Sequence, residues 1–402
     1  MTRLPASTAA APFATSFRPA LGPAVGGLLA LAVGIGIGRF VYTPILPPMV
    51  AGLGLSKFAA GLIASANFAG YLAGALFASG TWLPGTRRAW LLGGLAGSAV
   101  TTGAMGLTHA MAVFLVLRFA GGVASALVLI LVSAIVLESL AEAGRSGLVT
   151  VLFAGVGVGI AGSAVLVSVL RAAGQGWPAL WLASGALSLL AALIAAALIP
   201  PEAPVPPAPP RAPGARADHH LADHHLADRR LLRLVAAYGL FGFGYVITAT
   251  FLVAIVRSTP AIRPLEPVIW VVFGLAAVPS VALWTVLARR FGLGGAFALA
   301  ALVEALGVLA SVVWQSTAGV FAASVLVGGT FMGLTALGLV RGRELARGDA
   351  RRVLGLMTSA FGLGQILGPS FAGALSDRLG SFTVPSIVAA ATLVAAAALA
   401  ME

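Results

Sequence analysis

The sequence has no cysteine and only one lysine, Lys57, in its 402 residues. The lack of cysteine excludes disulfides, thiolate metal sites and cysteine nucleophiles. Only 9% of the residues are charged, whereas about 25% are charged in an ordinary soluble domain. Because 59% of the residues are apolar, the composition indicates a protein whose solvent is the lipid bilayer.

Motifs of several enzyme classes are also missing. The sequence contains no GxxxxGK[ST] phosphate loop, no HExxH metal motif and no GxSxG nucleophile motif. We therefore expect neither an enzyme nor an ATP-driven pump, and no cofactor. The glycine-rich string GVGVGIAG lies in a continuous apolar stretch, where we expect it to serve close helix packing. The first twenty residues have no apolar core, so we expect no cleavable signal peptide.

Long apolar runs dominate what is present. They are long enough to cross a hydrocarbon core of about 30 Å as helices, and they lack the alternating pattern of barrel strands. We predict an all-α polytopic membrane protein with twelve transmembrane helices, near residues 24–50, 58–80, 89–108, 111–137, 146–170, 177–199, 231–256, 266–288, 293–314, 317–340, 352–376 and 382–401.

The formal charge of +12 would suggest a nucleic-acid partner in a soluble protein. Here the distribution of the basic residues among the loops favours a membrane orientation instead. With a cytoplasmic N-terminus, seventeen basic residues fall on the cytoplasmic side, two lie within spans, and five fall outside, namely Lys57, Arg171, Arg257, Arg263 and Arg378. This distribution satisfies the positive-inside rule. We expect a multi-pass protein of the bacterial inner (plasma) membrane with both termini cytoplasmic, and no nucleic-acid partner.

A proline-rich stretch divides the chain into two parts. Such a stretch cannot form a packed helix and predicts an extended, solvated linker. We predict a disordered cytoplasmic tail (1–23), an N-terminal six-helix bundle (24–199), a cytoplasmic linker (200–230) and a C-terminal six-helix bundle (231–402). Four linker histidines are conceivable metal ligands, but their five-residue repeat does not hold one helical face, so we expect no metal site.

The two halves resemble each other at a nearly constant offset. At an offset of 206, Gly36 and Gly38 fall on Gly242 and Gly244. At an offset of 207 without a gap, eight residues of the first half fall on identical residues of the second, Phe114, Gly121, Gly122, Leu127, Arg145, Gly155, Gly157 and Ser163. The pattern indicates an internal duplication in which the two units have the same orientation.

A six-helix unit repeated around a central linker resembles the plan of the major facilitator superfamily. The segments GIGRFVYTPILPPM, GLIASANFAGYLAGAL and FGLGQILGP look like the YbfB/YjiJ group of bacterial transporters within it. The resemblance implies two bundles that rock about a central cavity lined mainly by helices 1, 4, 7 and 10. It also implies a small-molecule solute that reaches each side in turn.

Local motifs follow the superfamily unevenly. VLRFAGGVASA at 116–126 is similar to the arginine-and-glycine motif of helix 4, with Arg118 as its arginine. The loop between helices 2 and 3 lacks the aspartate of the usual cytoplasmic gating motif, whereas GALSDRLG at 373–380 matches the core of that motif on the predicted outer side. We expect Asp377 there, like His109, to be a solvated loop group.

Arg39 is the most informative residue of the apolar spans, because burial cannot neutralise arginine. Tyr42 and Thr43 follow it at three and four positions, which predicts one donor-rich helical face. One interpretation is that Arg39 pairs with an anionic group of the solute. The other is that Arg39 or Arg118 bonds to carbonyls freed near glycines and prolines of helix 1; for Arg118 both interpretations stay open.

Other polar residues are candidates to line the cavity. In the repeat Arg39 corresponds to Tyr245, and Thr248 lies three positions on, which suits an organic anion with an apolar body. Further candidates are Asn67, Tyr71 and Gln365, although buried polar side chains more often bond between helices. Glu304 is the one carboxylate in the middle of a span. It is either a structural group or a proton-coupling site.

These observations predict a secondary active transporter or facilitator that moves a small organic solute, first of all an organic anion. Efflux of amphipathic or aromatic compounds is the alternative within transport, and a non-transporting membrane sensor is an alternative outside it. We expect a monomer in the lipid bilayer, with H+ as the candidate coupling ion.

Overall fold

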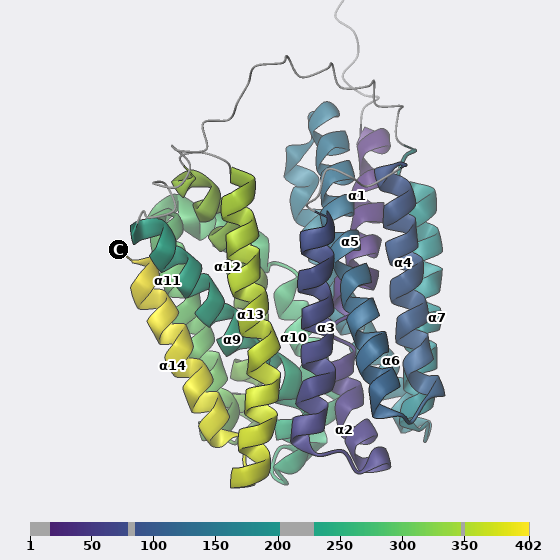
Figure 1. Ribbon diagram of the computed structural model, residues 1–402, viewed down its shortest axis with the longest axis vertical. Helices are drawn as coiled ribbons and strands as arrows, with labels where there is room; N and C mark the ends of the chain where they lie inside the picture. The colour runs from purple at the N-terminus through teal and green to yellow at the C-terminus, as the bar shows by residue number, and fades with distance from the viewer. Residues whose placement is uncertain (1–16, 79–84, 202–228, 347–349, 402) are drawn as a thin grey trace, which may run out of the picture.

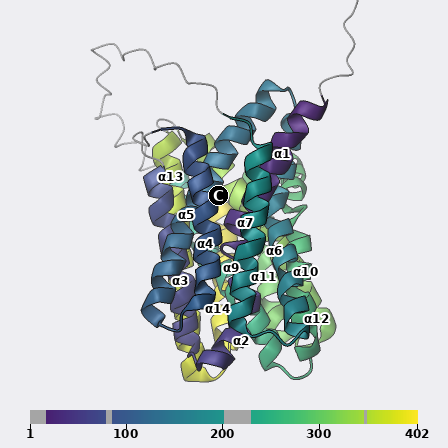
Figure 2. The same cartoon turned by 90° about the vertical axis from the view of Figure 1, so that its right-hand side faces the viewer.

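The computed structural model describes residues 17–78, 85–201, 229–346 and 350–401. The predicted tail up to residue 16 and most of the predicted linker, with its four histidines, lie outside the described residues. Helices are the only regular elements in the described ranges, and they run along the long axis of the molecule (Figure 1, Figure 2). The all-α prediction is confirmed.

In the described part of the first half, the chain forms seven α-helices, a π-helix and two short 3₁₀ turns, η2 (Met105–Leu107) and η3 (Ser146–Leu148). The α-helices and the π-helix are α1 (Phe17–Leu31), η1 (Ala32–Ile37), α2 (Tyr42–Leu53), α3 (Lys57–Ala78), α4 (Arg87–Ala104), α5 (Met111–Glu142), α6 (Val149–Ala172) and α7 (Trp177–Leu198). We call the end that holds the start of α1 the upper end, as in Figure 1, and the end that holds the link between α2 and α3 the lower end.

The second half begins at the upper end and continues in the same alternating manner (Figure 1). Its helices are α9 (Arg229–Ser258), α10 (Glu266–Ala277), α11 (Ser280–Val313), α12 (Thr317–Leu345), α13 (Ala350–Leu379) and α14 (Thr383–Ala400). A short 3₁₀ turn, η4 (Arg263–Leu265), leads into α10 at the lower end.

Ten helices in the described ranges are long and apolar enough to cross a membrane. The helices at two of the predicted spans, 266–288 and 352–376, are not among these ten: α10 and α13. α10 has only 12 residues, because Pro279, which follows it, has no N–H to continue the hydrogen-bond ladder. α13 carries basic residues near both ends and glycine, serine and glutamine in its middle. The chain is a multi-pass membrane protein, and twelve crossings remain a prediction.

α11 contains the boundary predicted between the eighth and ninth spans. Gly292 within it has a φ of 72° and a ψ of 166°, a backbone conformation that residues with a Cβ rarely adopt. The helical axis changes direction there, so α11 holds the end of one predicted span and the whole of the next.

Helices from the two halves pack directly on each other, α3 against α13 and α6 against α10. A Cβ on Gly157 of α6 would lie 2.6 Å from the carbonyl oxygen of Gly274 of α10. Small residues permit such close backbone approach between membrane helices. The glycine-rich string at 155–162 therefore serves as a packing surface.

Candidate functional site

The first membrane helix changes its winding just before Arg39. After α1, Ala32–Ile37 wind as a π-helix, and the amide of Gly38 donates to the carbonyl of Val33, five residues back, at 2.9 Å. A short turn separates this π-helix from α2. Single turns of π-helix inside α-helices frequently occur at functional sites.

Pro44 determines which carbonyl group of this turn is left without a backbone donor. Because Pro44 has no N–H, the carbonyl of Phe40 lacks its usual helical donor. The amide of Thr43 donates to Phe40 at 3.2 Å instead. The carbonyl of Arg39 therefore loses the amide that would bond to it in an α-helix.

Arg118 on α5 supplies the missing donors. Its Nη1 donates to the carbonyl of Gly38 at 2.9 Å and its Nη2 donates to the carbonyl of Arg39 at 3.1 Å. The guanidinium also lies over the ring of Tyr42, 5.1 Å from the ring centroid, a favourable cation–π geometry. Of the two interpretations left open for Arg118, this arrangement agrees with the one in which it bonds to carbonyls of helix 1.

The side chain of Arg39 has a different environment. Its Nη2 donates to Oε1 of Gln365 at 3.3 Å, beyond the usual range for N–H···O bonds. The guanidinium carbon lies 4.3 Å from the ring centroid of Tyr71 and 4.9 Å from that of Phe68. Its Nε has no hydrogen-bond partner. In the described part of the chain no carboxylate lies within ion-pair distance of Arg39, which is only 7% exposed.

Gln365 connects Arg39 to the second half of the chain. Its amide nitrogen donates to the hydroxyl of Tyr245 on α9. The ring of Tyr245 stacks on those of Phe331 and Phe361, each with a centroid distance of 5.8 Å. Arg39 therefore lies where a polar chain from α13 and α9 meets the first half, beside a group of aromatic rings.

Tyr42 and Thr43 do not form one donor surface with Arg39. The hydroxyl of Tyr42 donates to the carbonyl of Ala60 on α3, and that of Thr43 donates to the carbonyl of Ala249 on α9, both at 2.7 Å. The predicted shared face assumed regular α-helical spacing, whereas the chain is not α-helical between η1 and α2. The Thr43 bond joins the two halves of the chain.

Asn67 and Thr248 are buried close to this network. The amide of Asn67 on α3 donates to the carbonyl of Arg118 at 2.9 Å, as expected for a polar residue that bonds between helices. Its Oδ1 has no hydrogen-bond partner, and neither has the hydroxyl of Thr248, one turn beyond Tyr245 on α9. Both atoms retain hydrogen-bonding capacity inside the protein.

Glu304 is fully buried on α11. Neither carboxyl oxygen accepts a hydrogen bond within the described residues. The hydroxyl of Thr330 lies beside it, but this hydroxyl donates to the carbonyl of Leu326 at 2.7 Å. A charged carboxylate at this position would have no counter-charge, and the structure leaves open both roles considered for Glu304.

At the lower end, hydrogen bonds join the two halves of the chain. The carboxylate of Asp377 at the end of α13 accepts from the backbone amides of Lys57 and Phe58 at 3.0 and 2.8 Å. The ammonium of Lys57 donates in turn to the carbonyl of Ser376 at 3.1 Å. About two turns into α3, the hydroxyl of Ser65 donates to a carbonyl of α13 at 2.6 Å.

The expectation that Asp377 is only a solvated loop group is therefore wrong. It caps the first turn of α3, where backbone amides have no partner within the helix and the helix dipole favours an anion. Two sequence features bear on this contact, the GALSDRLG motif and the start of the span predicted near residues 58–80. They were not connected because 320 positions separate Asp377 from Lys57.

The predicted site residues thus fall into three groups. The first is a cluster around the Arg39 guanidinium, and the second is a network that satisfies the break in helix 1. The third consists of residues whose side chains form no hydrogen bond with either group within the described residues. The cluster contains Arg39, Tyr71, Gln365 and Tyr245. The network at the break contains Arg118, Tyr42 and Asn67. The third group contains Thr43, Thr248 and Glu304.

Comparisons with known proteins agree with this architecture. The family described as "Uncharacterised MFS-type transporter YbfB" matches residues 31–401. No curated protein matches the sequence. A structure of the nucleoside transporter NupG and one of a point mutant of it are similar to this chain, with TM-scores of 0.73 and 0.75 and identities of 15% and 14%. They align over 96% of this chain and over 98% and 99% of theirs.

A bacterial homologue of the human lysosomal transporter Spinster, described as inward-facing and unoccupied, is also similar. Its TM-score is 0.67 at 16% identity, over 96% of this chain and 97% of that one. At such identities the likeness shows a shared fold and does not extend to the solute.

Proposed function

This chain belongs to the family of YbfB-type transporters of the major facilitator superfamily, and from this membership we propose that it moves a small organic anion across the membrane by alternating access. It is a multi-pass membrane protein and not an enzyme. The anionic class of the solute rests on the environment of Arg39.

The observation that supports an anionic solute is a buried cation without an anion. A charged side chain in mid-membrane costs about 2.5–3.5 kcal/mol on insertion scales. Arg118 offsets this cost with two backbone carbonyls. Arg39 has one long bond to a neutral amide and an Nε without a partner.

A carboxylate or phosphate group fits what Arg39 leaves unused. The planar guanidinium binds such groups through two parallel N–H···O bonds. In the proposed complex the solute's anionic group takes the Nε and one Nη of Arg39, and the bond to Gln365 is given up. Asn67 Oδ1 and the hydroxyl of Thr248 supply further polar contacts when the halves separate.

For alternating access we propose the segments 24–199 and 231–402 as the two moving bundles. The bonds from Arg39 to Gln365 and from Thr43 to Ala249 join these bundles. They must break before the lower end opens. From the distribution of basic residues we propose that the lower end faces outward and that both termini are cytoplasmic, in a bacterial inner membrane.

Aromatic or amphipathic compounds are the second candidate class of solute. The ring stack of Tyr245 with Phe331, Phe361 and Phe241 lies directly beside Gln365. Stacked rings favour a flat aromatic body. One structural neighbour is described as a nucleoside transporter, and a nucleoside carries such a body without a negative charge. Export of amphipathic compounds would use the same surface.

Ligand-induced thermal stabilisation of the purified protein separates these classes. Organic carboxylates, organic cations and neutral aromatic compounds are screened against the wild type and Arg39→Gln, with Arg378→Gln as a control for lost charge. A ligand at about 100 times its Kd adds about 2.7 kcal/mol to folding stability. We expect carboxylates to stabilise the wild type and the control clearly more than Arg39→Gln. Equal stabilisation of all three by neutral aromatic compounds would favour the second class.

A further inference from the structure

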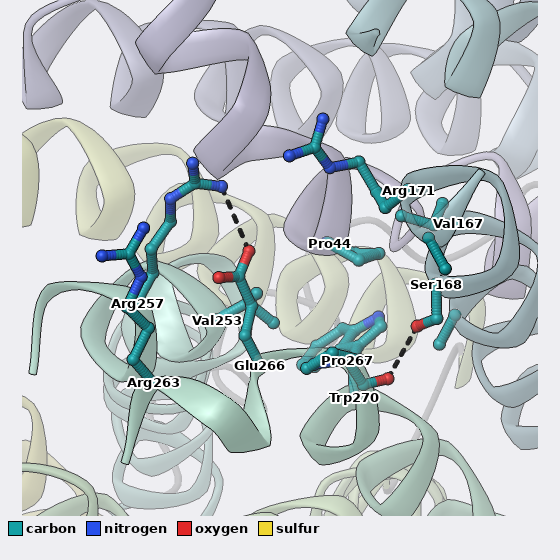
Figure 3. Close-up of a pocket in the computed structure, with 12 residues that line it drawn as sticks. Pro44, Val167, Ser168, Arg171, Val253, Arg257, Arg263, Glu266, Pro267 and Trp270 are labelled. Atoms are coloured by element: carbon teal, nitrogen blue, oxygen red, sulfur yellow. Dashed lines mark hydrogen bonds and ion pairs between the residues drawn. The ribbon is translucent and has the colours of Figure 1, made fainter. Parts of the chain in front are cut away.

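A cavity of about 350 Å³ lies at the lower end, away from the Arg39 cluster. Its walls come from both halves, from α2 and α6 on one side and from α9, η4 and α10 on the other. Figure 3 shows Arg171 on one side of this cavity, Arg257 and Arg263 on the other, and Pro44 and Trp270 between them. We call it the arginine vestibule.

The charge of the vestibule is predominantly positive. It has three arginines and one acid, Glu266, whose Oε1 lies 3.2 Å from Nη1 of Arg257. Arg171 donates one N–H to the carbonyl of Gln175 at 3.1 Å and keeps its other donors. The guanidinium of Arg263 has no hydrogen-bond or ion-pair partner within the described residues; only its backbone amide donates, to the carbonyl of Thr259 at 3.0 Å. In the described part of the chain, two guanidinium groups of the vestibule therefore lack a counter-anion.

Trp270 provides an independent sign of a ligand. The residue is 1% exposed and lines the vestibule, yet its indole Nε1 has no hydrogen-bond partner. An N–H group buried without an acceptor is costly and rare. The one hydroxyl in the wall, on Ser168, already donates to the carbonyl of Pro267 at 2.7 Å (Figure 3). The vestibule thus has hydrogen-bond donors without acceptors, both on charged guanidinium groups and on the neutral indole of Trp270.

The remaining wall is apolar. Pro44, Val167 and Val253 line the cavity together with Trp270, so the vestibule has both an apolar wall and basic side chains. Arginine pairs best with carboxylate and phosphate oxygens, and a positively charged cleft raises the local concentration of such anions.

We infer that the arginine vestibule is a second anion-binding site, which holds the carboxylate of an organic anion at the lower mouth of the transport path. Arg171 binds the carboxylate, Arg263 adds positive charge on the opposite side of the cavity, and the apolar wall with the N–H of Trp270 contacts the body of the solute. The inference deepens the proposed function, and the site lies between the parts that separate when the lower end opens.

Benzoate binding in an Arg39→Gln background tests this site separately from the Arg39 cluster. Thermal stabilisation by benzoate, with benzamide as the neutral comparison, is measured for Arg39→Gln alone and with Arg171→Gln and Arg263→Gln added. We expect benzoate but not benzamide to stabilise Arg39→Gln, and the added changes to raise its Kd about tenfold or more, since charge-assisted bonds are lost. Arg378→Gln added instead, an exposed arginine at the same end, should leave the Kd unchanged.

Three outcomes would overturn the inference. Benzoate could fail to stabilise Arg39→Gln, or the Arg378→Gln control could weaken binding equally. Alternatively, phosphatidylglycerol in mixed micelles could stabilise the protein through Arg171 and Arg263 while benzoate fails to compete, which would make the vestibule a lipid site.

Equal benzoate binding by wild type and Arg39→Gln would contradict the proposed role of Arg39 and support the vestibule as the binding site. A Trp270→Phe variant, which keeps the ring but loses the N–H, should weaken benzoate without lowering the melting temperature of the free protein.

Discussion

At the scale of single residues, two buried arginines of the same chemistry differ in what they contact. Arg118 donates to two carbonyls that the break in helix 1 leaves free, whereas Arg39 has a long bond to Gln365 and an unpaired Nε. An unsatisfied buried carbonyl costs about 1–3 kcal/mol. Arg118 therefore stabilises the fold, and Arg39 is available for another partner.

Replacing each arginine by methionine, which has a similar length and no donor, separates these roles. Arg118→Met leaves the carbonyls of Gly38 and Arg39 without donors, so we expect a clearly lower melting temperature in detergent. Arg39→Met removes a buried charge along with one weak bond, so its melting temperature should stay near that of the wild type while stabilisation by the carboxylate falls. Equal destabilisation by both changes would assign Arg39 a structural role as well.

Glu304 allows a second prediction at this scale. Its carboxyl has no counter-charge and no hydrogen bond in the described part of the protein, and glutamine has nearly the same shape without any charge. We expect Glu304→Gln to keep the melting temperature and any pH dependence of transport, measured by uptake into proteoliposomes across a pH series. Loss of that pH dependence with transport otherwise intact would make Glu304 the proton-coupling site.

At the scale of elements, the end of α13 bonds to the start of α3 at the lower end of the molecule. The first amides of α3 lack partners within their helix, and Asp377 at the end of α13 accepts from two of them. Side-chain caps of this kind contribute about 0.5–2 kcal/mol. Because α3 and α13 belong to different halves, the proposed alternating access requires these bonds to break when the lower end opens.

Asp377→Ala should therefore shift the population toward an open lower end. The chain has no cysteine, so Ala51→Cys on α2 and Leu379→Cys on α13 place two spin labels without a background signal. We expect electron paramagnetic resonance to show a larger share of long label distances with Asp377→Ala than without it. The neighbouring change Arg378→Ala should leave the distribution as it is. An unchanged distribution with Asp377→Ala would show that the cap has no part in closure.

At the scale of the whole molecule, the positions of most helices could be predicted because the length of an apolar run limits where a helix can cross the bilayer. The spans predicted at 266–288 and 293–314 are the exception, since this region forms the short α10 and the kinked α11. The family follows from segments that can be read locally. The π-helix before Arg39, the bonds of Arg118 and the cap by Asp377 could not be predicted in the same way. They depend on how helices far apart in sequence are placed against each other, which hydropathy does not determine.

The same distinction applies to the candidate site. Arg39, Tyr71, Gln365 and Tyr245 were each singled out as polar residues in apolar spans, and the structure brings them together. Thr43 was selected by helical spacing from Arg39, and it bonds to another helix because the spacing is broken. A rule based on α-helical periodicity fails where the helix itself is irregular.

The central claim is that Arg39 is the counter-charge of the transported solute. The most direct measurement is a double cycle of binding free energies in a protein that carries Arg171→Gln and Arg263→Gln and so lacks the vestibule site. The best-binding carboxylate from the screen and its primary amide are each titrated into this protein with and without Arg39→Gln. We predict that the protein with Arg39 prefers the carboxylate by about tenfold or more, since a charge-assisted bidentate pair forms, and that Arg39→Gln in this background binds both compounds alike. A preference for the carboxylate that survives in Arg39→Gln would contradict the account and move the recognition of charge to another part of the protein.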